Sequence, residues 1–227
     1  NGRNVTLIAP RRMGKTGLVK HVFYKLREQE PDIVTFYMDI YSTQALGDFI
    51  RLFASTVLGR LDSVPQKALG RVGKFIKSCR PVFTFDELTG QPKVTIDIVP
   101  SSEEATLREI FDYLRSSEKR CYIAIDEFQQ IAEFKDSKTF QKRLRSIWQL
   151  QKSVSYCLFG SKKHLMNELF EKKSLPFYKF GDAIYLSKIE TRDWIDYICR
   201  RFEATGKRIS EKLAEKICQM VDNHSSY

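Results

Sequence analysis

The sequence predicts a three-layer α/β fold, with helices on both faces of a parallel sheet, and three observations support this prediction. Short apolar runs alternate with segments of helical apolar spacing over most of the chain, which is the order of parallel strands joined by helices. The first run, at residues 4–9, leads through a turn into Gly-Lys-Thr at residues 14–16 and then into a helical pattern. A later run, at residues 122–125, ends in Asp126 and Glu127. A parallel sheet would bring these two motifs to the same edge.

The composition is that of an ordinary globular protein. The 227 residues suffice for one large domain, and hydrophobic and charged residues make up 42% and 29% of them, which is a typical balance. No apolar run approaches the roughly 18 residues of a membrane span, and no signal peptide precedes the first strand. We therefore expect a cytoplasmic protein with no membrane contact. The five scattered cysteines form no CxxC pair, so buried free thiols are a better interpretation than disulfides or zinc.

The charge balance leaves the question of a nucleic-acid partner open. Lysine and arginine total 38 against 28 acidic residues, for a net charge of +10. Such an excess could reflect a nucleic-acid partner. We favour a positive nucleotide cleft plus ordinary solvated lysines, because the basic residues are spread along the chain and no aromatic–basic motif appears. DNA is thus a weakly supported partner.

The first motif has the chemistry of a phosphate-binding loop. Backbone N–H groups at a helix N-terminus point at phosphate oxygens, and the helix dipole favours their charge. Lys15 would add a positive charge at the β- and γ-phosphates, and the Thr16 hydroxyl would ligate Mg²⁺. Gly14 and Gly17 lack a Cβ, so the backbone can approach the phosphates closely. The expected nucleotide-binding residues are Pro10, Arg11, Arg12, Met13, Gly14, Lys15, Thr16 and Gly17.

One position of this loop departs from the usual G-x-x-x-x-G-K-[ST] pattern. Ala9 stands where the first glycine is expected. That glycine usually lets the chain leave the strand in a strained turn, so Ala9 puts ideal loop geometry in doubt. The alternative, a chance Gly-Lys-Thr at a helix start, is disfavoured by the strand and helix patterns on either side.

The following segments continue the alternation of strands and helices. Residues 33–39 form a buried strand that ends in an acidic residue, and helices are expected over about 45–61 and 66–77. Two short β runs, Pro81–Asp86 and Lys93–Ile98, predict a hairpin. Because the core alternates strand and helix, we interpret this hairpin as an insertion on the sheet edge.

The second half supplies three more strands. Residues 120–125, 154–159 and 183–186 have strand character, and helical patterns separate them. From residue 188 onward the pattern is all-helical, with Thr191 and Ser210 as expected helix caps and Trp194, Ile195, Ile198 and Phe202 on a buried face. We expect a nucleotide-binding core over residues 1–187, with the hairpin insertion at about 80–98, and the start of a helical lid over 188–227 that is cut short.

Asp126 and Glu127 supply the second half of the site. At the carboxyl edge of the sheet, Asp126 would hold Mg²⁺ largely through water, and Glu127 would polarise the water that attacks the γ-phosphate. Ser161, at the tip of a neighbouring strand, could contact the γ-phosphate or this water, and it could also cap the helix at 162–170. The candidate catalytic residues are Glu127, Lys15 and Ser161, and the candidate metal ligands are Thr16 and Asp126.

These motifs resemble those of a known family. The segments are Pro10-Arg11-Arg12-Met13-Gly14-Lys15-Thr16, Ile125-Asp126-Glu127-Phe128 and Phe159-Gly160-Ser161. The chain is similar to the archaeal-type ATPase family, which belongs with the AAA+ and STAND P-loop NTPases, and it looks like a bacterial member. The resemblance implies a five-stranded parallel sheet in the order 5-1-4-3-2, ATP and Mg²⁺ as cofactors, and a C-terminal domain that this chain lacks.

An arginine that the family often carries before the last core strand is absent here. Members often have Tyr-Gly-Arg at that point, whereas this chain has Lys179-Phe180-Gly181. Lys179 lacks the planar fork of arginine. Arg143 and Arg145 are other candidates that could act in trans, although a solvated helix face explains both more simply. We therefore expect this chain alone to hydrolyse ATP inefficiently.

Functions of different classes stay open. The first is an ATPase whose hydrolysis cycle moves the lid and the missing domains, and the second is a slow, nucleotide-gated STAND-type switch or scaffold. Glu127 favours turnover, whereas Ala9 and the missing arginine favour the switch. A DNA-handling ATPase is a third interpretation. Beyond the nucleotide, the expected partners are an unidentified protein client or C-terminal domain, with an oligomer possible.

Overall fold

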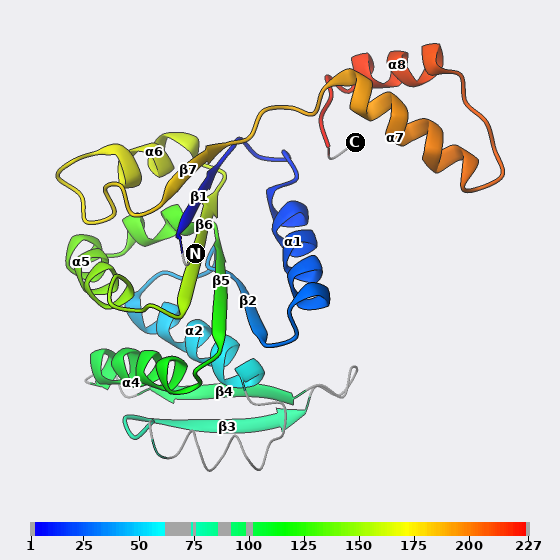
Figure 1. Ribbon diagram of the computed structural model, residues 1–227. Coiled ribbons are helices and arrows are strands. Elements are labelled where there is room, and N and C mark those ends of the chain that lie inside the picture. The colour runs from blue at the N-terminus through cyan, green and yellow to red at the C-terminus, as the bar shows by residue number, and fades with distance from the viewer. Residues whose placement is uncertain (1–2, 62–73, 75, 86–91, 99–101, 226–227) are drawn as a thin grey trace.

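The computed structural model describes residues 3–61, 74, 76–85, 92–98 and 102–225. Its main sheet has five parallel strands in the order β2-β5-β6-β1-β7 (Figure 1). Numbered along the core, this order is 5-1-4-3-2, so the predicted topology is confirmed. The strands are β1 (Val5–Ile8), β2 (Ile33–Asp39), β5 (Arg120–Asp126), β6 (Val154–Gly160) and β7 (Asp182–Tyr185).

Helices cover both faces of this sheet. Figure 1 shows α1 on one side, and α2, α5 and α6 on the other. The helices of the core are α1 (Lys15–Gln29), α2 (Leu46–Leu61), α4 (Glu103–Ser116), α5 (Ser137–Trp148) and α6 (Lys163–Glu171), with the 3₁₀ helix η2 (Phe128–Glu133) after β5. The helix that we expected over residues 66–77 lies almost wholly outside the described residues.

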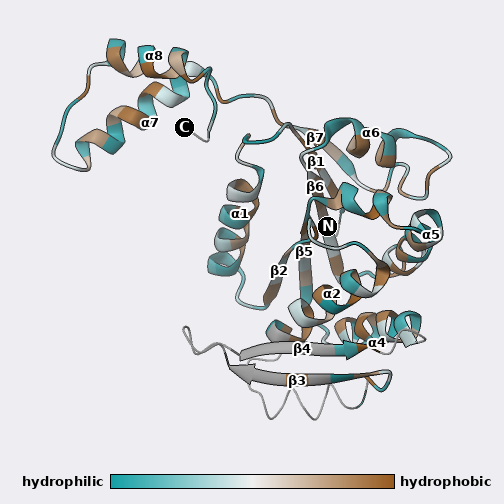
Figure 2. Cartoon of the chain, turned by 180° about the vertical axis from the view of Figure 1, so that it is seen from behind, coloured by the Kyte–Doolittle hydropathy of each residue, from teal (hydrophilic) through white to brown (hydrophobic). Residues whose placement is uncertain are grey.

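Alternation along the strands divides the core in two. On β1, Leu7 packs with Val19 and Phe23 of α1, whereas its neighbour Ile8 joins the larger cluster on the opposite face. This is the period-2 alternation of side chains along a strand. The strands carry much of the hydrophobic sequence in Figure 2.

An aromatic cluster fills the larger core between α5, η2 and the segment before β7. The Trp148 ring stacks on Tyr156 with centroids 4.1 Å apart. Phe177 is fully buried and lies edge-on to Phe128 at 5.2 Å. These contacts fix the loop between α6 and β7, so the fifth strand is held against β1 by packing as well as by its ladder.

The predicted hairpin forms, but its expected place was wrong. Strands β3 (Cys79–Phe85) and β4 (Pro92–Ile98) pair only with each other, in a separate antiparallel sheet of two strands. Strand β4 packs against α2, and Figure 1 shows the hairpin below α2 and α4. The hairpin therefore does not extend the edge of the main sheet, because a helix supplies the apolar surface that it covers.

The last two helices stand apart from the sheet (Figure 1). Helices α7 (Thr191–Glu203) and α8 (Glu211–Met220) pack on each other. The Ser210 hydroxyl accepts a hydrogen bond from the backbone N–H of Leu213, so the predicted cap is present. The cap predicted at Thr191 was wrong, because Thr191 is already helical and Glu190 precedes it as the N-cap.

The apolar face predicted for α7 is not buried. No residue of α7 is buried, and Trp194, Ile195 and Ile198 are only half-covered. Phe202 is exposed, as are Leu213 and Met220 on α8. The amphipathic pattern correctly indicated a helix, but it could not say how much of the apolar face a neighbour covers. In the part of the chain described, no helix has the length and hydropathy needed to cross a membrane.

Candidate phosphate-binding site

A cleft of about 370 Å³ opens at the carboxyl end of the main sheet, beside the N-terminus of α1. It draws on the loop after β1, the ends of β2 and β5, and the tip of β6. Its lining residues are Arg11, Arg12, Met13, Gly14, Lys15, Thr16, Gly17, Asp39, Tyr41, Asp126, Glu127 and Ser161. All the site residues predicted from sequence line this cleft except Pro10. The carbonyl of Pro10 accepts a hydrogen bond from Lys15, which does line it.

The loop turns through two residues with left-handed backbone. Arg12 has φ 63° and Gly14 has φ 75°. Helix α1 starts directly after Gly14, whose carbonyl accepts the N–H of Leu18. Alternating right- and left-handed residues turn successive N–H groups into one concavity, which is an anion-binding geometry. Ala9 is buried and its φ is not positive, so the turn places no left-handed strain on the position where a glycine was expected.

Lys15 is folded back on its own loop. Its side chain is buried, and its Nζ donates to the carbonyl oxygens of Ala9 at 2.9 Å and Pro10 at 2.7 Å. Burial lowers the pKa of the Lys15 ammonium, and the nearby carboxylates of Glu127 and Asp126 oppose this shift.

Asp126 accepts three hydrogen bonds at the end of β5. Its Oδ2 accepts from the hydroxyls of Thr16 at 2.7 Å and Tyr37 at 3.0 Å, and its Oδ1 accepts the backbone N–H of Glu127 at 2.9 Å. Burial raises the pKa of Asp126, while these hydrogen bonds pull it down. The two candidate metal ligands, Thr16 and Asp126, are thus in direct contact.

Glu127 lies at the turn after β5 with left-handed backbone, φ 54°. Its Oε2 accepts hydrogen bonds from Ser161 Oγ at 3.0 Å and from the side-chain amide of Gln129. Ser161 in turn accepts from Arg11 Nε at 3.3 Å. A hydrogen-bonded chain therefore runs from the phosphate loop through Ser161 to Glu127. Two donors hold Oε2, and within the described part of the chain no hydrogen bond reaches Oε1.

The alternative role of Ser161 as a helix cap is not found. Helix α6 begins at Lys163 with Lys162 as its N-cap. The Ser161 hydroxyl is instead engaged with Glu127. Ser161 lines the cleft, and its contact with the γ-phosphate or the attacking water stays a prediction.

Gln129 is packed against the strand tip that carries Ser161. It is buried, and a Cβ placed on Gly160 would lie 1.7 Å from its Oε1. Only glycine leaves room for this amide at position 160. Because Gly160, at the end of β6, has no side chain, the Gln129 amide can reach Glu127.

The candidate trans-acting cations are engaged outside the cleft. Arg143 pairs with Glu104, and the Arg145 guanidinium lies 4.7 Å from the Phe180 ring centroid. Lys179 lies just before β7, whose first residue pairs with the first residue of β1. The phosphate loop follows the last residue of β1, so Lys179 is at the opposite end of the sheet and cannot reach the phosphate loop of its own chain.

Tyr37, Asp39, Tyr41 and Gln129 belong to the site but were not predicted from the sequence. Asp39 pairs in register with Asp126, so the ends of β2 and β5 meet at the cleft. The sequence shows that the second strand ends in Asp39. Knowing that this strand pairs in parallel with the strand ending in Asp126 would have placed Asp39 at the site. No sequence signal marks Tyr37 or Gln129, because their reach depends on strand register and on the turn after Glu127.

The cleft fits a magnesium–phosphate complex better than a metal bound by protein alone. No cluster of three or more potential metal-ligating His, Cys, Asp or Glu residues occurs among the described residues. Mg²⁺ usually takes one or two protein oxygens and fills its other positions with water and phosphate. Thr16 and Asp126 provide such a pair of oxygens.

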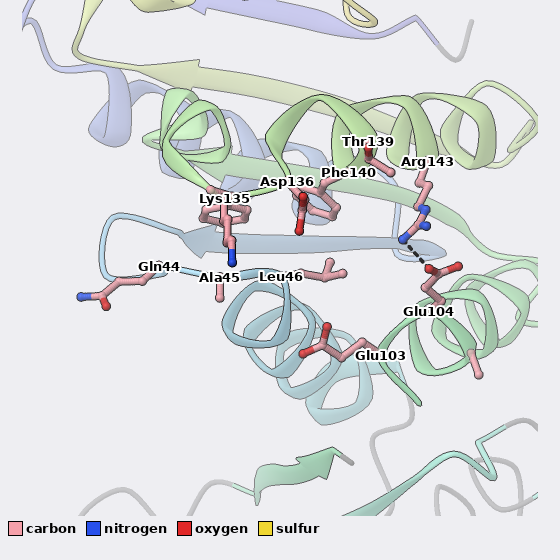
Figure 3. A pocket seen from close by; sticks show the side chains of 12 residues that line it. Gln44, Ala45, Leu46, Glu103, Glu104, Lys135, Asp136, Thr139, Phe140 and Arg143 are labelled. Atoms are coloured by element: carbon pink, nitrogen blue, oxygen red, sulfur yellow. Dashed lines mark ion pairs between the residues drawn. The ribbon is translucent and has the colours of Figure 1, made fainter. Parts of the chain in front are cut away.

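A second, larger cavity of about 740 Å³ lies where the N-terminal ends of α2, α4 and α5 meet. Figure 3 shows Arg143 of α5 pointing at Glu104 of α4 across it, with Phe140 also on its wall. The segments after β2 and after β5 contribute residues to both the cleft and this cavity. A hydrogen bond joins the two segments, from the side-chain amide of Gln130 to the carbonyl of Thr43. Of the residues singled out from the sequence, only the candidate trans-acting Arg143 lines this cavity.

The motifs, the strand order and the cleft agree with a comparison of the sequence against protein families. A sequence model for the family described as "AAA domain" matches residues 1–168, which include the phosphate loop, Asp126, Glu127 and Ser161. The chain belongs to the AAA domain family. This family consists of P-loop ATPases, so the AAA domain described here is a nucleotide-binding protein of the ATPase type.

Solved structures show the same fold at low sequence identity. The Walker-type ATPase PABY2304 of Pyrococcus abyssi has a TM-score of 0.65 and 16% identity, over 98% of this chain and 59% of that one. The Aeropyrum pernix ORC1 protein in complex with DNA has a TM-score of 0.56 and 14% identity, over 89% and 44%. The Aeropyrum pernix ORC2 protein in its ADPNP–ADP complexes has a TM-score of 0.56 and 13% identity, over 99% of this chain and 62% of that one. This AAA domain thus spans about half the length of these proteins. A search of curated protein sequences found no match.

Proposed function

We propose that this AAA domain hydrolyses ATP to ADP and phosphate with Mg²⁺, and that the state of the nucleotide is coupled to the position of α7 and α8. The observation that carries the proposal is the placement of Glu127. Its carboxylate lies in the same cleft as Lys15 and as the Thr16–Asp126 pair, and one of its oxygens is fixed by Ser161 and Gln129. A phosphate cradle alone would not require an oriented carboxylate of this kind.

The residues divide the chemical work between them. Backbone N–H groups of the loop and the Lys15 ammonium would hold the phosphates, and Thr16 and Asp126 would hold the metal. A Mg²⁺ ion held by these residues would supply positive charge to the phosphate oxygens. Glu127 accepts a proton from the attacking water through Oε1, and Ser161 keeps that carboxylate in place. Arg11, through Ser161, links the phosphate loop to the base.

Residues 188–227 act as the lid in this proposal and residues 1–187 as the core. One contact supports the coupling: the Ser225 hydroxyl donates to the carbonyl of Arg12 at 2.7 Å. The segment after α8 therefore touches the phosphate loop from outside the cleft. A change in the loop when phosphates bind would alter this contact and move the lid.

The alternative function is a nucleotide-gated switch of the STAND type with little turnover. It is favoured by the engagement of Arg143 and Arg145 elsewhere and by the position of Lys179 at the far end of the sheet. Without an arginine supplied by another subunit, stabilisation of transition-state charge would rest on Lys15, the metal and the arginines of the loop. Such a site would bind tightly and turn over slowly.

Turnover of ATP by the full-length protein separates these functions. We expect measurable phosphate release from the wild type, loss of both binding and turnover in Lys15→Ala, and loss of turnover with retained ATP binding in Glu127→Gln. Binding is measured with a fluorescent ATP analogue and turnover by phosphate release. A wild type that binds ATP but hydrolyses no more than Glu127→Gln would refute the enzyme and leave the switch.

Handling of DNA is a further candidate, supported by the net charge of +10 and by the DNA-bound state of the similar ORC1 structure. Binding through phosphate contacts would weaken steeply as salt rises. The test is DNA mobility with the full-length protein across a salt series. Unchanged mobility at low salt would exclude this function.

A further inference from the structure

Tyr37 connects the second strand of the sheet to the candidate metal ligand. It lies on β2, and its hydroxyl donates to Asp126 Oδ2 at 3.0 Å. Thr16 donates to the same oxygen from the start of α1, at 2.7 Å. Asp126 is therefore held from two sides, by the phosphate loop and by a strand that is not part of that loop.

The Tyr37 ring has little freedom to move. Its centroid lies 6.5 Å from that of Phe159 on β6, and the ammonium of Lys20 on α1 lies 4.8 Å from its centroid. The backbone of Tyr37 is fixed in the ladder opposite Ala124. A tyrosine has only two side-chain torsions before its hydroxyl, so this packing determines where the hydroxyl points.

The two donors to Asp126 differ in what happens to them when a metal binds. The Thr16 oxygen would ligate Mg²⁺, so its position depends on the metal and the phosphates. The Tyr37 hydroxyl ligates nothing in this arrangement and can hold the carboxylate in one orientation throughout. A site whose supporting residues are fixed in advance binds its ion without first ordering the ligand.

We propose that Tyr37 is a positioning residue for Mg²⁺, which acts by holding Asp126 in the orientation that the metal requires. This inference rests on the proposed function of the cleft as a Mg²⁺–ATP site. It predicts that Tyr37 contributes to the part of nucleotide affinity that depends on Mg²⁺. It also predicts that Tyr37 contributes little to phosphate binding by the loop itself.

The test compares Tyr37→Phe with wild type in the full-length protein. The dissociation constant of a fluorescent ATP analogue is measured with Mg²⁺ and again with EDTA. The ratio of the Kd in EDTA to the Kd in Mg²⁺ reports how much the metal contributes to affinity. A hydrogen bond to a carboxylate, once removed, should lower this ratio roughly tenfold. Affinity in EDTA should stay within about twofold of wild type, because the loop, α1 and Lys15 are unchanged.

Tyr24→Phe is the matched control. The Tyr24 hydroxyl also donates to a carboxylate, that of Glu28, but on the exposed surface of α1. This variant should show the wild-type ratio. Circular dichroism of each variant establishes that it is folded.

The outcomes separate the inference from the function on which it rests. A folded Tyr37→Phe protein with the wild-type ratio overturns the positioning role and leaves the Mg²⁺–ATP site intact. Equal losses of affinity in Mg²⁺ and in EDTA also overturn it, since they indicate general damage to the cleft. A wild type that gains no affinity from Mg²⁺ overturns the proposed metal site, and the role of Tyr37 with it. A reduced ratio in Tyr37→Phe alone supports the inference.

Discussion

Substitution of Gly160 by alanine tests how the cleft is built. The new Cβ would lie 1.7 Å from Gln129 Oε1 and 3.2 Å from Met166 Sδ. The Met166 thioether can shift by a few tenths of an ångström, but the Gln129 amide must move away. Because Gln129 is buried and donates to the Glu127 carboxylate, its movement breaks that hydrogen bond.

The size of the effect follows from the bond that is lost. A hydrogen bond to a charged group contributes about 1.5–3 kcal/mol, and crowding in a packed core costs about 1–3 kcal/mol where it cannot relax. Part of the crowding is relieved when the amide moves, so we expect Gly160→Ala to lower the free energy of unfolding by about 2–3 kcal/mol. For a chain of this size, that corresponds to a fall in Tm of roughly 4–12 °C.

Urea unfolding of four proteins measures this effect: wild type, Gly160→Ala, Gln129→Ala and the double variant. If the Gln129 amide is the obstacle, Gly160→Ala should change the free energy of unfolding very little in the Gln129→Ala background. The coupling energy of the cycle should then be about 2–3 kcal/mol, well above the error of such cycles. Gly17→Ala is the matched control, because no atom would lie within 4 Å of its Cβ, and a glycine replaced within a helix gains up to about 1 kcal/mol. Additive effects of Gly160→Ala and Gln129→Ala would refute this account of the packing.

Two further predictions concern the core. Phe177 is fully buried among Phe128, Trp148 and Phe180, so Phe177→Ala should cost about 3–5 kcal/mol in urea unfolding; a loss below 1 kcal/mol would show that the segment before β7 is not anchored there. Burial raises the pKa of Cys121 to about 11 and that of Cys157 to about 12. Both thiols should therefore stay neutral at pH 8 and react with iodoacetamide at least about 100-fold more slowly than in the urea-unfolded chain, as measured by peptide mass spectrometry. Since the folded-state pKa values are the higher ones, these thiols stabilise the fold fully below the unfolded pKa of about 8.5, and this contribution is lost as pH rises towards 11–12. Equal labelling of the native and unfolded proteins would contradict the burial of these cysteines.

The fold could be predicted from sequence because its signals are local. Each strand of the main sheet is a short apolar run bounded by turn residues, and the strand order followed from the resemblance to a family. The two strands of the hairpin were predicted, but the helix against which they pack was not. Its sequence says that two strands pair, whereas its packing on α2 depends on which apolar surface remains uncovered after the sheet has formed.

The site was predicted where sequence motifs define it and missed where register defines it. Lys15, Thr16, Asp126 and Glu127 belong to motifs with fixed spacing, and the structure brings them into one cleft. Tyr37 could not be found in this way, because a tyrosine in a buried strand is indistinguishable from a core residue until the neighbouring strand is known. Gln129 depends on the left-handed turn at Glu127, which sequence spacing does not reveal.

The interior position of β1, between β6 and β7, has a consequence for how the cleft forms during synthesis. This strand pairs with β6 on one side and β7 on the other, so during synthesis it must wait for about 150 residues before its first partner exists. Contacts between distant segments form late and slowly. The cleft needs residues from 11 to 161, and no shorter nascent chain can assemble it. Nucleotide binding should therefore begin only after β6 has been made and paired with β1, and ATP should favour chains that have reached this stage over shorter ones.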